Sequence, residues 1–205
     1  MGERMIKIKN LKKYYDKKLI LEIENLKFSE RKIYSILGRN GAGKSTLLKI
    51  LGGILFYDEG ELEYKIDNTI LCTQEPLFFK GSVIYNLTEP FKLIDKKIDL
   101  KKIFELLDIF QITNLKEAKV SNLSGGEKAK VQFIRTILYD KEIMLFDEPT
   151  ASMDKKSSYL VENILKNMRD AGKLIIIITH DYEQAIRISD YIYEVDEGKL
   201  SQRGT

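Results

Sequence analysis

Cysteine, histidine and proline are scarce in this sequence, which contains 1, 1 and 3 of them respectively. A single cysteine, Cys72, excludes an internal disulfide and a cysteine-rich metal site. Cys72 lies in the apolar run TILCT, so we expect a buried thiol on a strand. The low proline content and the lack of compositionally biased segments are typical of a chain that folds nearly throughout.

Long hydrophobic runs are also missing. The longest purely aliphatic run, residues 174–178, has five residues, whereas a helix that crosses a bilayer needs about 20. The start, MGERMIKIKN, alternates charged and apolar residues and lacks the apolar stretch of a signal peptide. We therefore expect a cytoplasmic protein that does not cross a bilayer by itself.

An excess of charge of one sign is absent too, because 34 basic and 31 acidic residues leave a net charge of +3. This balance does not indicate a nucleic-acid partner, and we expect none. One local cluster of lysines is interpreted as the solvated face of a strand, with a phosphate or lipid contact as the alternative. The cluster consists of Lys7, Lys9, Lys12, Lys13, Lys17 and Lys18.

Apolar periodicity predicts strands early in the chain and then an alternation of strands and helices. Such alternation is typical of an α/β fold, with a parallel sheet and helices on its faces. The expected strands cover residues 5–10, 19–25, 32–37, 61–65, 69–73, 143–146, 174–179 and 191–195. The expected helices cover residues 44–51, 127–138, 157–172 and 181–190, and only a short tail, GKLSQRGT, is expected at the end.

The segment 75–124 differs in character and is interpreted as a helical insert. Pro76 and Pro90 punctuate its first part. Its second part contains IDLKKIFELLDIF, in which an i, i+3, i+4, i+7 stripe predicts one buried helix face. That stripe consists of Leu100, Ile103, Phe104 and Leu107.

The strongest local motif is GRNGAGKST, residues 38–46, which matches the phosphate-loop pattern. It follows a predicted strand and begins a predicted helix, so its small residues let backbone N–H groups face phosphates at the positive helix terminus. Lys44 is expected to reach the outer phosphates and Ser45 to hold Mg²⁺. An ordinary glycine turn is the alternative, which the strand and helix context disfavours.

A second motif, IMLFDEP, ends a predicted parallel strand in two carboxylates at the sheet edge where ligands bind. Asp147 is expected to complete the Mg²⁺ shell, and Glu148 to polarise the attacking water. Alone, two carboxylates after a strand would more often cap a helix. The phosphate loop upstream favours the catalytic interpretation.

Residues 122–127, NLSGGE, resemble the motif that separates the ATP-binding cassette (ABC) family from other phosphate-loop proteins. Ser124, Gly125 and Gly126 would form a second helix N-terminus suited to a γ-phosphate. In the family the two phosphate cradles of one site belong to different subunits. The resemblance therefore implies that two copies pair head to tail around two ATP molecules.

Other positions match the family in order along the chain. Gln74 matches the glutamine that contacts Mg²⁺ and water and senses the membrane partner, and residues 152–154, ending in Asp154, match a segment that crosses the dimer interface. His180 matches the histidine that touches the γ-phosphate, although a lone histidine could equally be structural. Tyr15 resembles the aromatic residue that stacks on adenine. The alternatives are that Tyr15 is a core residue or that its neighbour Tyr14 is the residue that matches the family.

The resemblance covers residues 6–200 and implies one ATPase domain over residues 1–205. It implies a phosphate-loop core with a mainly parallel sheet and an N-terminal antiparallel β subdomain (1–74 and 125–205) and an inserted helical subdomain (75–124). Two small departures are Glu127, where glutamine is commoner, and the missing glycine in FSERK. The implied catalytic residues are Glu148, His180 and Gln74, and the implied metal ligands are Ser45, Gln74 and Asp147. The implied nucleotide-binding residues are Tyr15, Gly38, Arg39, Asn40, Gly41, Ala42, Gly43, Lys44, Ser45, Thr46, Ser124, Gly125, Gly126 and Asp154.

The family resemblance implies an ATPase that uses ATP and Mg²⁺ and energises transport through a separate permease, at the inner face of the membrane. A substrate-binding protein is a further expected partner. The run PLFFKGSV beside Gln74 is where the family docks the permease, although Leu77, Phe78 and Phe79 could instead be core residues. Parts of the sequence look most like importers of tungstate or related oxyanions, while LFFKGSV also looks like exporters.

Three rival functions are less well supported. Cassettes that act in DNA repair or translation usually carry a long coiled coil or two cassettes in one chain, and neither is present. A kinase or GTPase is disfavoured by NLSGGE and by the lack of an Asn-Lys-x-Asp motif. A module that binds ATP without hydrolysing it is disfavoured by the presence of Glu148 and His180.

Overall fold

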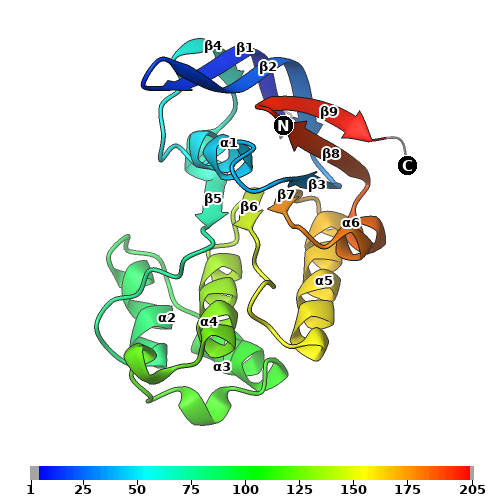
Figure 1. The fold of residues 1–205 in the computed structure, drawn as a ribbon. Coiled ribbons are helices and arrows are strands. Elements are labelled where there is room, and N and C mark those ends of the chain that lie inside the picture. Colours follow the sequence, from blue (N-terminus) through cyan, green and yellow to red (C-terminus); the bar gives the residue numbers. More distant parts are fainter. Residues whose placement is uncertain (1–4, 204–205) are drawn as a thin grey trace. The chain divides into compact units, whose positions relative to one another are not determined.

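The computed structural model describes residues 5–203, which form two compact units. Within these residues the first unit comprises 5–71, 141–148 and 162–203, and the second comprises 72–140 and 149–161. The second unit thus contains the segment predicted as a helical insert, 75–124, together with residues 72–74, 125–140 and 149–161. Figure 1 shows the elements in chain order.

A nine-stranded sheet organises the chain, in the order β4-β1-β2-β9-β8-β3-β7-β6-β5. The pairs β3–β7, β3–β8 and β6–β7 are parallel, and β1–β2, β1–β4 and β8–β9 are antiparallel. The predicted α/β fold, with a mainly parallel sheet and antiparallel N-terminal strands, is confirmed. The strands are β1 (Met5–Tyr15), β2 (Lys18–Ser29), β3 (Lys32–Gly38), β4 (Glu59–Glu63), β5 (Thr69–Cys72), β6 (Ile143–Asp147), β7 (Leu174–Ile178), β8 (Tyr191–Asp196) and β9 (Lys199–Arg203).

The centre of the sheet is buried on both faces. Every residue of β6 and β7 is buried, as their continuous apolar sequences require for strands covered on both sides. Helix α1 (Lys44–Leu51) begins within the phosphate-loop motif and buries Leu47, Leu48 and Leu51 in the same core. The helix therefore coincides with its predicted bounds, because its apolar face has a partner throughout.

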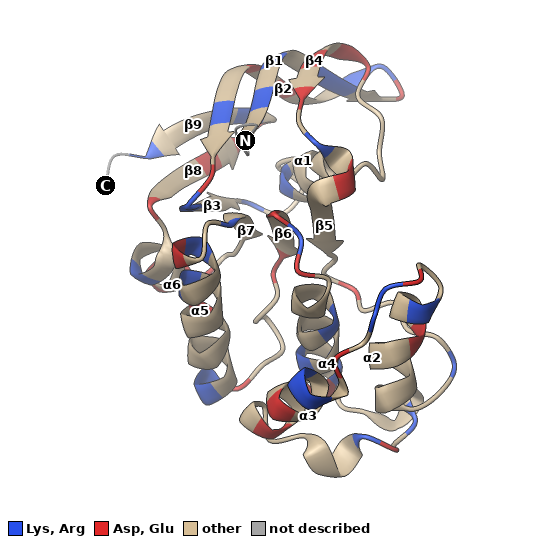
Figure 2. Cartoon of the chain, turned by 180° about the vertical axis from the view of Figure 1, so that it is seen from behind, with Lys and Arg blue, Asp and Glu red and all other residues tan. Residues whose placement is uncertain are grey.

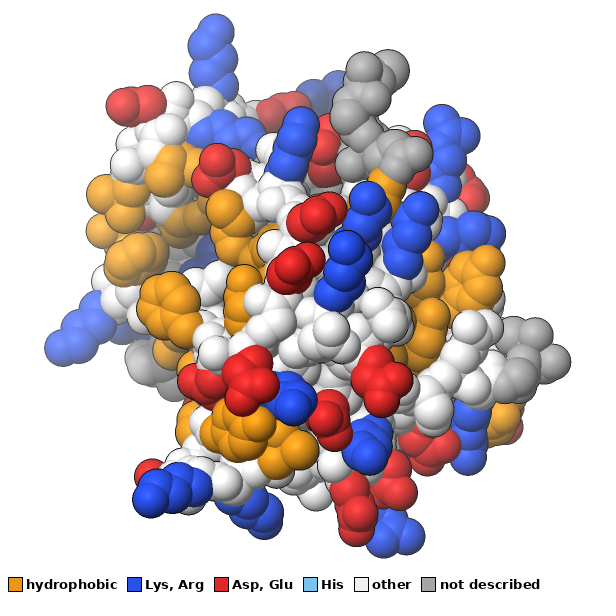
Figure 3. Space-filling view, turned by 90° about the horizontal axis from the view of Figure 1, so that it is seen from above, with side chains coloured by type: hydrophobic (Ala, Val, Ile, Leu, Met, Phe, Trp, Pro, Cys, Tyr) orange, Lys and Arg blue, Asp and Glu red, His pale blue; other side chains and the backbone are white. Residues whose placement is uncertain are grey.

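The lysine-rich N-terminal strands form a charged hairpin. Asp16 and Lys17 adopt positive φ angles of 47° and 67° in the turn, as two-residue hairpins require. Figure 2 shows basic positions on β1 beside acidic positions on β4, and on the face in Figure 3 basic and acidic side chains of the described residues are interleaved. The ion pairs are Lys7–Glu63, Lys9–Glu61, Lys12–Glu59, Lys12–Glu22 and Lys13–Asp58.

The prediction of a solvated lysine face is correct for Lys7 and Lys9 but wrong for Lys13, which is only 8% exposed. The prediction of a tail after β8 is also wrong, because residues 199–203 form β9, which pairs antiparallel with β8. Alternation in KLSQR is weak and its burial is slight, so its strand conformation depends on pairing with a neighbour.

The second unit contains α2 (Val83–Lys92), α3 (Leu100–Ile109) and α4 (Gly125–Leu138). Pro90 lies inside the last turn of α2, whereas the sequence suggested a break; the helix continues through it to Lys92 without the backbone hydrogen bond that proline cannot donate. The buried face of α3 is also shifted from the predicted stripe. Ile103 and Leu107 are buried as expected, but Leu100 and Phe104 are 52% and 38% exposed, and Leu106 is buried instead.

The remaining helices are α5 (Lys155–Asp170), which passes from the second unit into the first, and α6 (Tyr182–Ile188). Within residues 5–203, no helix is both long and apolar enough to cross a bilayer. Cys72 is buried at the end of β5, as predicted.

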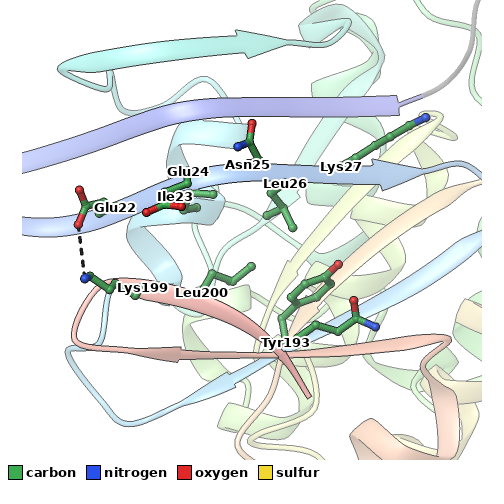
Figure 4. A pocket seen from close by; sticks show the side chains of 10 residues that line it. Glu22, Ile23, Glu24, Asn25, Leu26, Lys27, Tyr193, Lys199 and Leu200 are labelled. Carbon is green, nitrogen blue, oxygen red and sulfur yellow. Dashed lines mark ion pairs between the residues drawn. The ribbon is translucent and has the colours of Figure 1, made fainter. Parts of the chain in front are cut away.

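A cavity of about 580 Å³ lies between β2 and the β8–β9 hairpin. Strands β2 and β9 are paired only at Glu22 and Lys199, whose side chains are 3.9 Å apart, and they diverge beyond this point. Figure 4 shows Leu26, Leu200 and Tyr193 pointing into the space between the strands. None of the predicted nucleotide-site residues lines this cavity.

Candidate nucleotide site

The phosphate loop leaves β3 at Gly38, and two of its glycines are required by close backbone packing. A Cβ atom at Gly38 would collide with the carbonyl oxygen of Val195, and one at Gly43 would lie 2.9 Å from the carbonyl oxygen of Ile20. Both glycines also have positive φ angles, of 141° and 105°. These positions hold the loop against strands β8 and β2.

The N-terminus of α1 is suited to an anion. Its N-cap, Gly43, makes no side-chain hydrogen bond to the first turn, and no acidic residue lies in that turn. The Lys44 side chain, only 6% exposed, donates to the carbonyl oxygens of Gly38 and Arg39 at 2.8 and 2.9 Å. Backbone N–H groups, the helix dipole and this ammonium group all favour bound phosphate at the loop.

The two carboxylates after β6 have different environments. Asp147 is 5% exposed and accepts a hydrogen bond from the Ser45 side chain. Burial raises the pKa of Asp147, while the Ser45 hydrogen bond acts in the opposite direction. Asp147 and Ser45, predicted from separate motifs, are therefore neighbours in the first unit.

Glu148 adopts a left-handed backbone conformation with φ 50°, which is uncommon for a residue with a side chain. Its N–H donates to the carbonyl of Ile178 at 3.0 Å, which fixes it beside β7. The Glu148 carboxylate lies 3.1 Å from Nδ1 of His180, which follows β7 by two residues. This geometry brings together a carboxylate base and a histidine at the carboxyl ends of adjacent parallel strands.

The side-chain oxygens of Ser45 and Asp147 fit a Mg²⁺ ion. They are hard ligands, and Mg²⁺ commonly uses one or two protein ligands, several waters and phosphate oxygens. Among residues 5–203 there is no group of three or more His, Cys, Asp and Glu side chains arranged to hold a metal. A Mg²⁺ ion held by these two side chains would complete its shell with water and phosphate oxygens, as in a MgATP complex.

Tyr15 lies at the end of β1 and is 47% exposed, so the alternative that it is a core residue is wrong. Its neighbour Tyr14 instead hydrogen-bonds the carboxylate of Glu59 through its hydroxyl, at 3.2 Å. The same hairpin continues to Ile20, whose carbonyl packs on Gly43. Tyr15 is thus an available aromatic ring on the hairpin that contacts the phosphate loop.

In the second unit, the N-terminus of α4 is closed by a capping box. The Ser124 hydroxyl accepts from the N–H of Glu127 at 3.4 Å, and the Ser124 N–H donates to the Glu127 carboxylate at 2.8 Å. The Ser124 hydroxyl also lowers the pKa of Glu127. Glutamate in place of the commoner glutamine therefore completes the cap, and Gly125 and Gly126 form the first turn of the helix.

Residues 152–154 pack against this helix. A Cβ atom at Gly126 would lie 2.7 Å from the carbonyl oxygen of Ser152. Asp154 accepts from the N–H and the hydroxyl of Ser157 at 2.8 and 2.7 Å, and pairs with Lys130 of α4 at 3.2 Å. The Ser157 hydroxyl contributes most to lowering the pKa of Asp154. Asp154 therefore caps α5 and joins it to α4.

Two residues of α4 that the sequence did not single out hold the segment on either side of Gln74. Gln132 donates to the carbonyl of Thr73 at 2.8 Å. Arg135 donates to the carbonyl of Leu77 at 2.7 Å and lies over the Phe78 ring, 5.1 Å from its centroid. The sequence feature that could have identified them is their i, i+3 spacing, which places two polar side chains next to each other on a helix of buried apolar residues.

The apolar segment held by Arg135 is exposed. Leu77 is 73% and Phe79 is 44% exposed, so these two are not core residues.

The predicted site residues fall into two sets. The first unit holds Tyr15, residues 38–46, Asp147, Glu148 and His180, and the second holds Gln74, Ser124, Gly125, Gly126 and Asp154.

Comparisons with known proteins indicate the same family as the sequence motifs. A family model described as ABC transporter matches residues 21–151. The chain is 36% identical to the tungstate uptake system ATP-binding protein TupC of Peptoclostridium acidaminophilum, over 96% of this chain and 97% of that protein. It is 29% identical to the methionine import ATP-binding protein MetN of Clostridium acetobutylicum, over 98% of this chain and 68% of that protein. A solved ATP-binding subunit of an ABC transporter superposes with a TM-score of 0.86 at 19% identity, over 98% of this chain and 90% of that one.

Proposed function

Because this chain belongs to the ABC transporter family and is an ABC transporter ATPase, we propose that it hydrolyses MgATP as a head-to-tail pair of copies and drives a separate permease. The observation that carries the hydrolytic role is the Glu148–His180 pair, 3.1 Å apart in the unit that holds the phosphate loop. The second cradle, Ser124 to Gly126, supports a site shared between two copies, because it is a further helix N-terminus suited to a phosphate.

In the proposed reaction, Lys44 and the loop N–H groups bind the β- and γ-phosphates. Glu148 accepts a proton from water, whose oxygen forms a bond to the γ-phosphorus while the bond from phosphorus to the β–γ bridging oxygen breaks. His180, oriented through Nδ1 by Glu148, contacts the γ-phosphate with its other nitrogen. Tyr15 stacks on the adenine.

Mg²⁺ would be held by Ser45 and Asp147, with Gln74 as a further ligand, and would neutralise charge on the phosphate oxygens. The partner copy's Ser124, Gly125 and Gly126 would complete the γ-phosphate site. Asp154 would lie at the interface between copies. Closure of this interface on ATP and its reopening after hydrolysis would drive transport.

The permease is proposed to dock on the exposed Leu77 and Phe79 of the segment beside Gln74. Large exposed apolar side chains in one short loop are typical of an interaction surface. Arg135 would hold this loop to α4, the helix that begins with the phosphate cradle. With the permease bound, the chain would lie on the cytoplasmic face of the membrane.

We propose import of a tungstate-like oxyanion, with a substrate-binding protein as an additional partner. Support comes from the uptake role named for the 36% identical relative and from its similar length. The MetN similarity favours import but a different substrate class. An exporter subunit is the alternative, whereas the match to the ABC transporter family disfavours a mechanical ATPase outside transport. Genes beside this one that encode a permease and an anion-binding protein would support import.

The experiment that tests the catalytic proposal is Glu148→Gln. It should leave MgATP binding intact, reduce turnover by about a hundredfold or more, and trap a dimer that light scattering detects in ATP. Ser124→Arg is the matched variant in the second cradle, and it should prevent the dimer while the monomer still binds ATP. Normal turnover in Glu148→Gln would remove this residue from its role.

A further inference from the structure

The end of β1 contains an unusual buried lysine. Lys13 is 8% exposed although residues 15–19, at the turn of the same hairpin, are exposed. Its ammonium group lies 3.1 Å from the carboxylate of Asp58 and 5.6 Å from the centroid of the Tyr15 ring. A lysine this buried needs a partner for its charge, and here it has a carboxylate together with an aromatic ring.

Asp58 contacts three consecutive residues that precede Tyr15. Its carboxylate accepts from the Tyr14 N–H at 2.7 Å and from Lys13, and its own N–H donates to the Lys12 carbonyl at 2.9 Å. The Tyr14 N–H and then Lys13 lower the pKa of Asp58, so its carboxylate is ionised at neutral pH. These are charge-assisted hydrogen bonds, which are stronger than neutral ones.

Regular sheet pairing fails where these contacts occur. The β1–β2 register shifts between Lys13 and Tyr14, and the β1–β4 register shifts between Lys9 and Lys12. Beyond the shift, Tyr14 and Tyr15 pair again with Leu19 and Lys18, and Asp58 adds hydrogen bonds at the irregular position just before Tyr15.

Asp58 also belongs to the loop that follows the phosphate-binding helix. This loop is tied back to α1, since the N–H groups of Ile54 and Leu55 both donate to the Lys49 carbonyl, at 2.9 and 3.1 Å. A short path thus runs from the phosphate loop through α1 to Asp58 and on to Tyr15.

We propose that Asp58 is a positioning residue for the adenine of ATP, acting by fixing the backbone before Tyr15 and by placing the Lys13 ammonium against the Tyr15 ring. This inference rests on the proposed stacking of Tyr15 on adenine. Asp58 itself touches no part of the nucleotide in this account. Its effect should therefore appear only for ligands that contain the base.

The test compares MgATP with magnesium tripolyphosphate, which has the phosphates without the nucleoside, by calorimetric titration of the full chain. The quantity of interest is the ratio of the two dissociation constants. Tyr15→Ala should reduce the preference for ATP by about tenfold or more, the range for loss of one base-stacking ring. Asp58→Ala should reduce it by about three- to tenfold, with tripolyphosphate affinity unchanged, because the ring remains but is misplaced.

Two variants serve as controls. Asp58→Asn retains an acceptor for the Tyr14 N–H but loses the charge that faces Lys13, so its effect should be smaller than that of Asp58→Ala. Glu61→Gln removes another carboxylate that pairs with a β1 lysine, Lys9, and should leave the ratio unchanged. Circular dichroism and thermal unfolding establish that each variant is folded.

The outcomes separate the two proposals. If Tyr15→Ala lowers the ratio and Asp58→Ala does not, the positioning role is wrong and the stacking role stands. If Asp58→Ala weakens both ligands equally, its role is structural and the inference is overturned. If neither variant changes the ratio, Tyr15 does not bind adenine and both proposals fail.

Discussion

Replacing Gly126 by alanine probes the packing of the second phosphate cradle, with Gly125 as a matched control one residue away. A methyl group at Gly126 would lie 2.7 Å from the carbonyl oxygen of Ser152. A methyl group at Gly125 would lie 3.8 Å from the nearest atom, Cβ of Ser152. The first contact needs a shift of backbone, whereas the second is ordinary van der Waals contact.

The magnitude follows from this difference. Removing a glycine lowers the conformational entropy of the unfolded chain and stabilises a protein by about 0.4–1 kcal/mol where the backbone tolerates it. Overpacking against a rigid neighbour costs about 1–3 kcal/mol. Gly125→Ala should therefore be as stable as wild type or slightly more stable, and Gly126→Ala should be less stable than Gly125→Ala by about 1–3 kcal/mol.

Urea unfolding followed by circular dichroism measures both free energies, and their difference cancels the shared unfolded-state effect. ATPase assays add a second readout. Gly125→Ala should lose about tenfold or more in turnover although it is stable, because its methyl group would face the partner's γ-phosphate. Equal stability of the two variants would refute the packing argument, and full activity of Gly125→Ala would refute its place in the cradle.

Three further changes have expected outcomes. Lys44→Ala should weaken MgATP binding about tenfold or more in calorimetry, because the ammonium group at the phosphate loop is lost; unchanged affinity would contradict the site. Arg135→Lys should speed hydrogen exchange at residues 77–79, because lysine lacks the planar guanidinium that bonds Leu77 and covers Phe78. The ATPase activity measured without permease should stay within about twofold of wild type. Unchanged exchange would show that Arg135 does not hold the loop. Asp147→Asn should remove Mg²⁺-dependent ATPase activity. The pKa of Asp147 is raised in the folded chain, so wild type should lose stability relative to Asp147→Asn as the pH rises from the ordinary pKa of 3.8 through the folded value. Urea unfolding at several pH values measures the difference in free energy of unfolding between the two proteins. A difference that does not change with pH would contradict the raised pKa.

The sequence predicted the elements whose patterns are local. Helix α1 follows from its apolar spacing and the glycines that flank it, and β6 and β7 follow from short, fully apolar runs. The phosphate loop is recognisable because its chemistry depends on consecutive residues. The proximity of Asp147 to Ser45 could also be anticipated, since parallel strands place their carboxyl ends at one edge.

Features that depend on distant partners were missed. Strand β9 exists because β8 pairs with it, and the buried face of α3 depends on what covers that helix. Lys13 reads as a surface lysine until Asp58, 45 positions away, is placed beside it. Gln132 and Arg135 have functional interest only because they bond to backbone carbonyls 59 and 58 positions away.

We propose that each ATPase site is divided between two copies of the chain, and mixing two inactive variants tests this division. Lys44→Ala disables the phosphate loop but keeps the second cradle, and Ser124→Arg does the opposite. In an equal mixture, each dimer that contains one of each variant has one intact site, so the ATPase rate should return to about a quarter of the wild-type rate with random pairing and to about half if only mixed dimers form. A rate no higher than that of the separate variants would contradict a shared site.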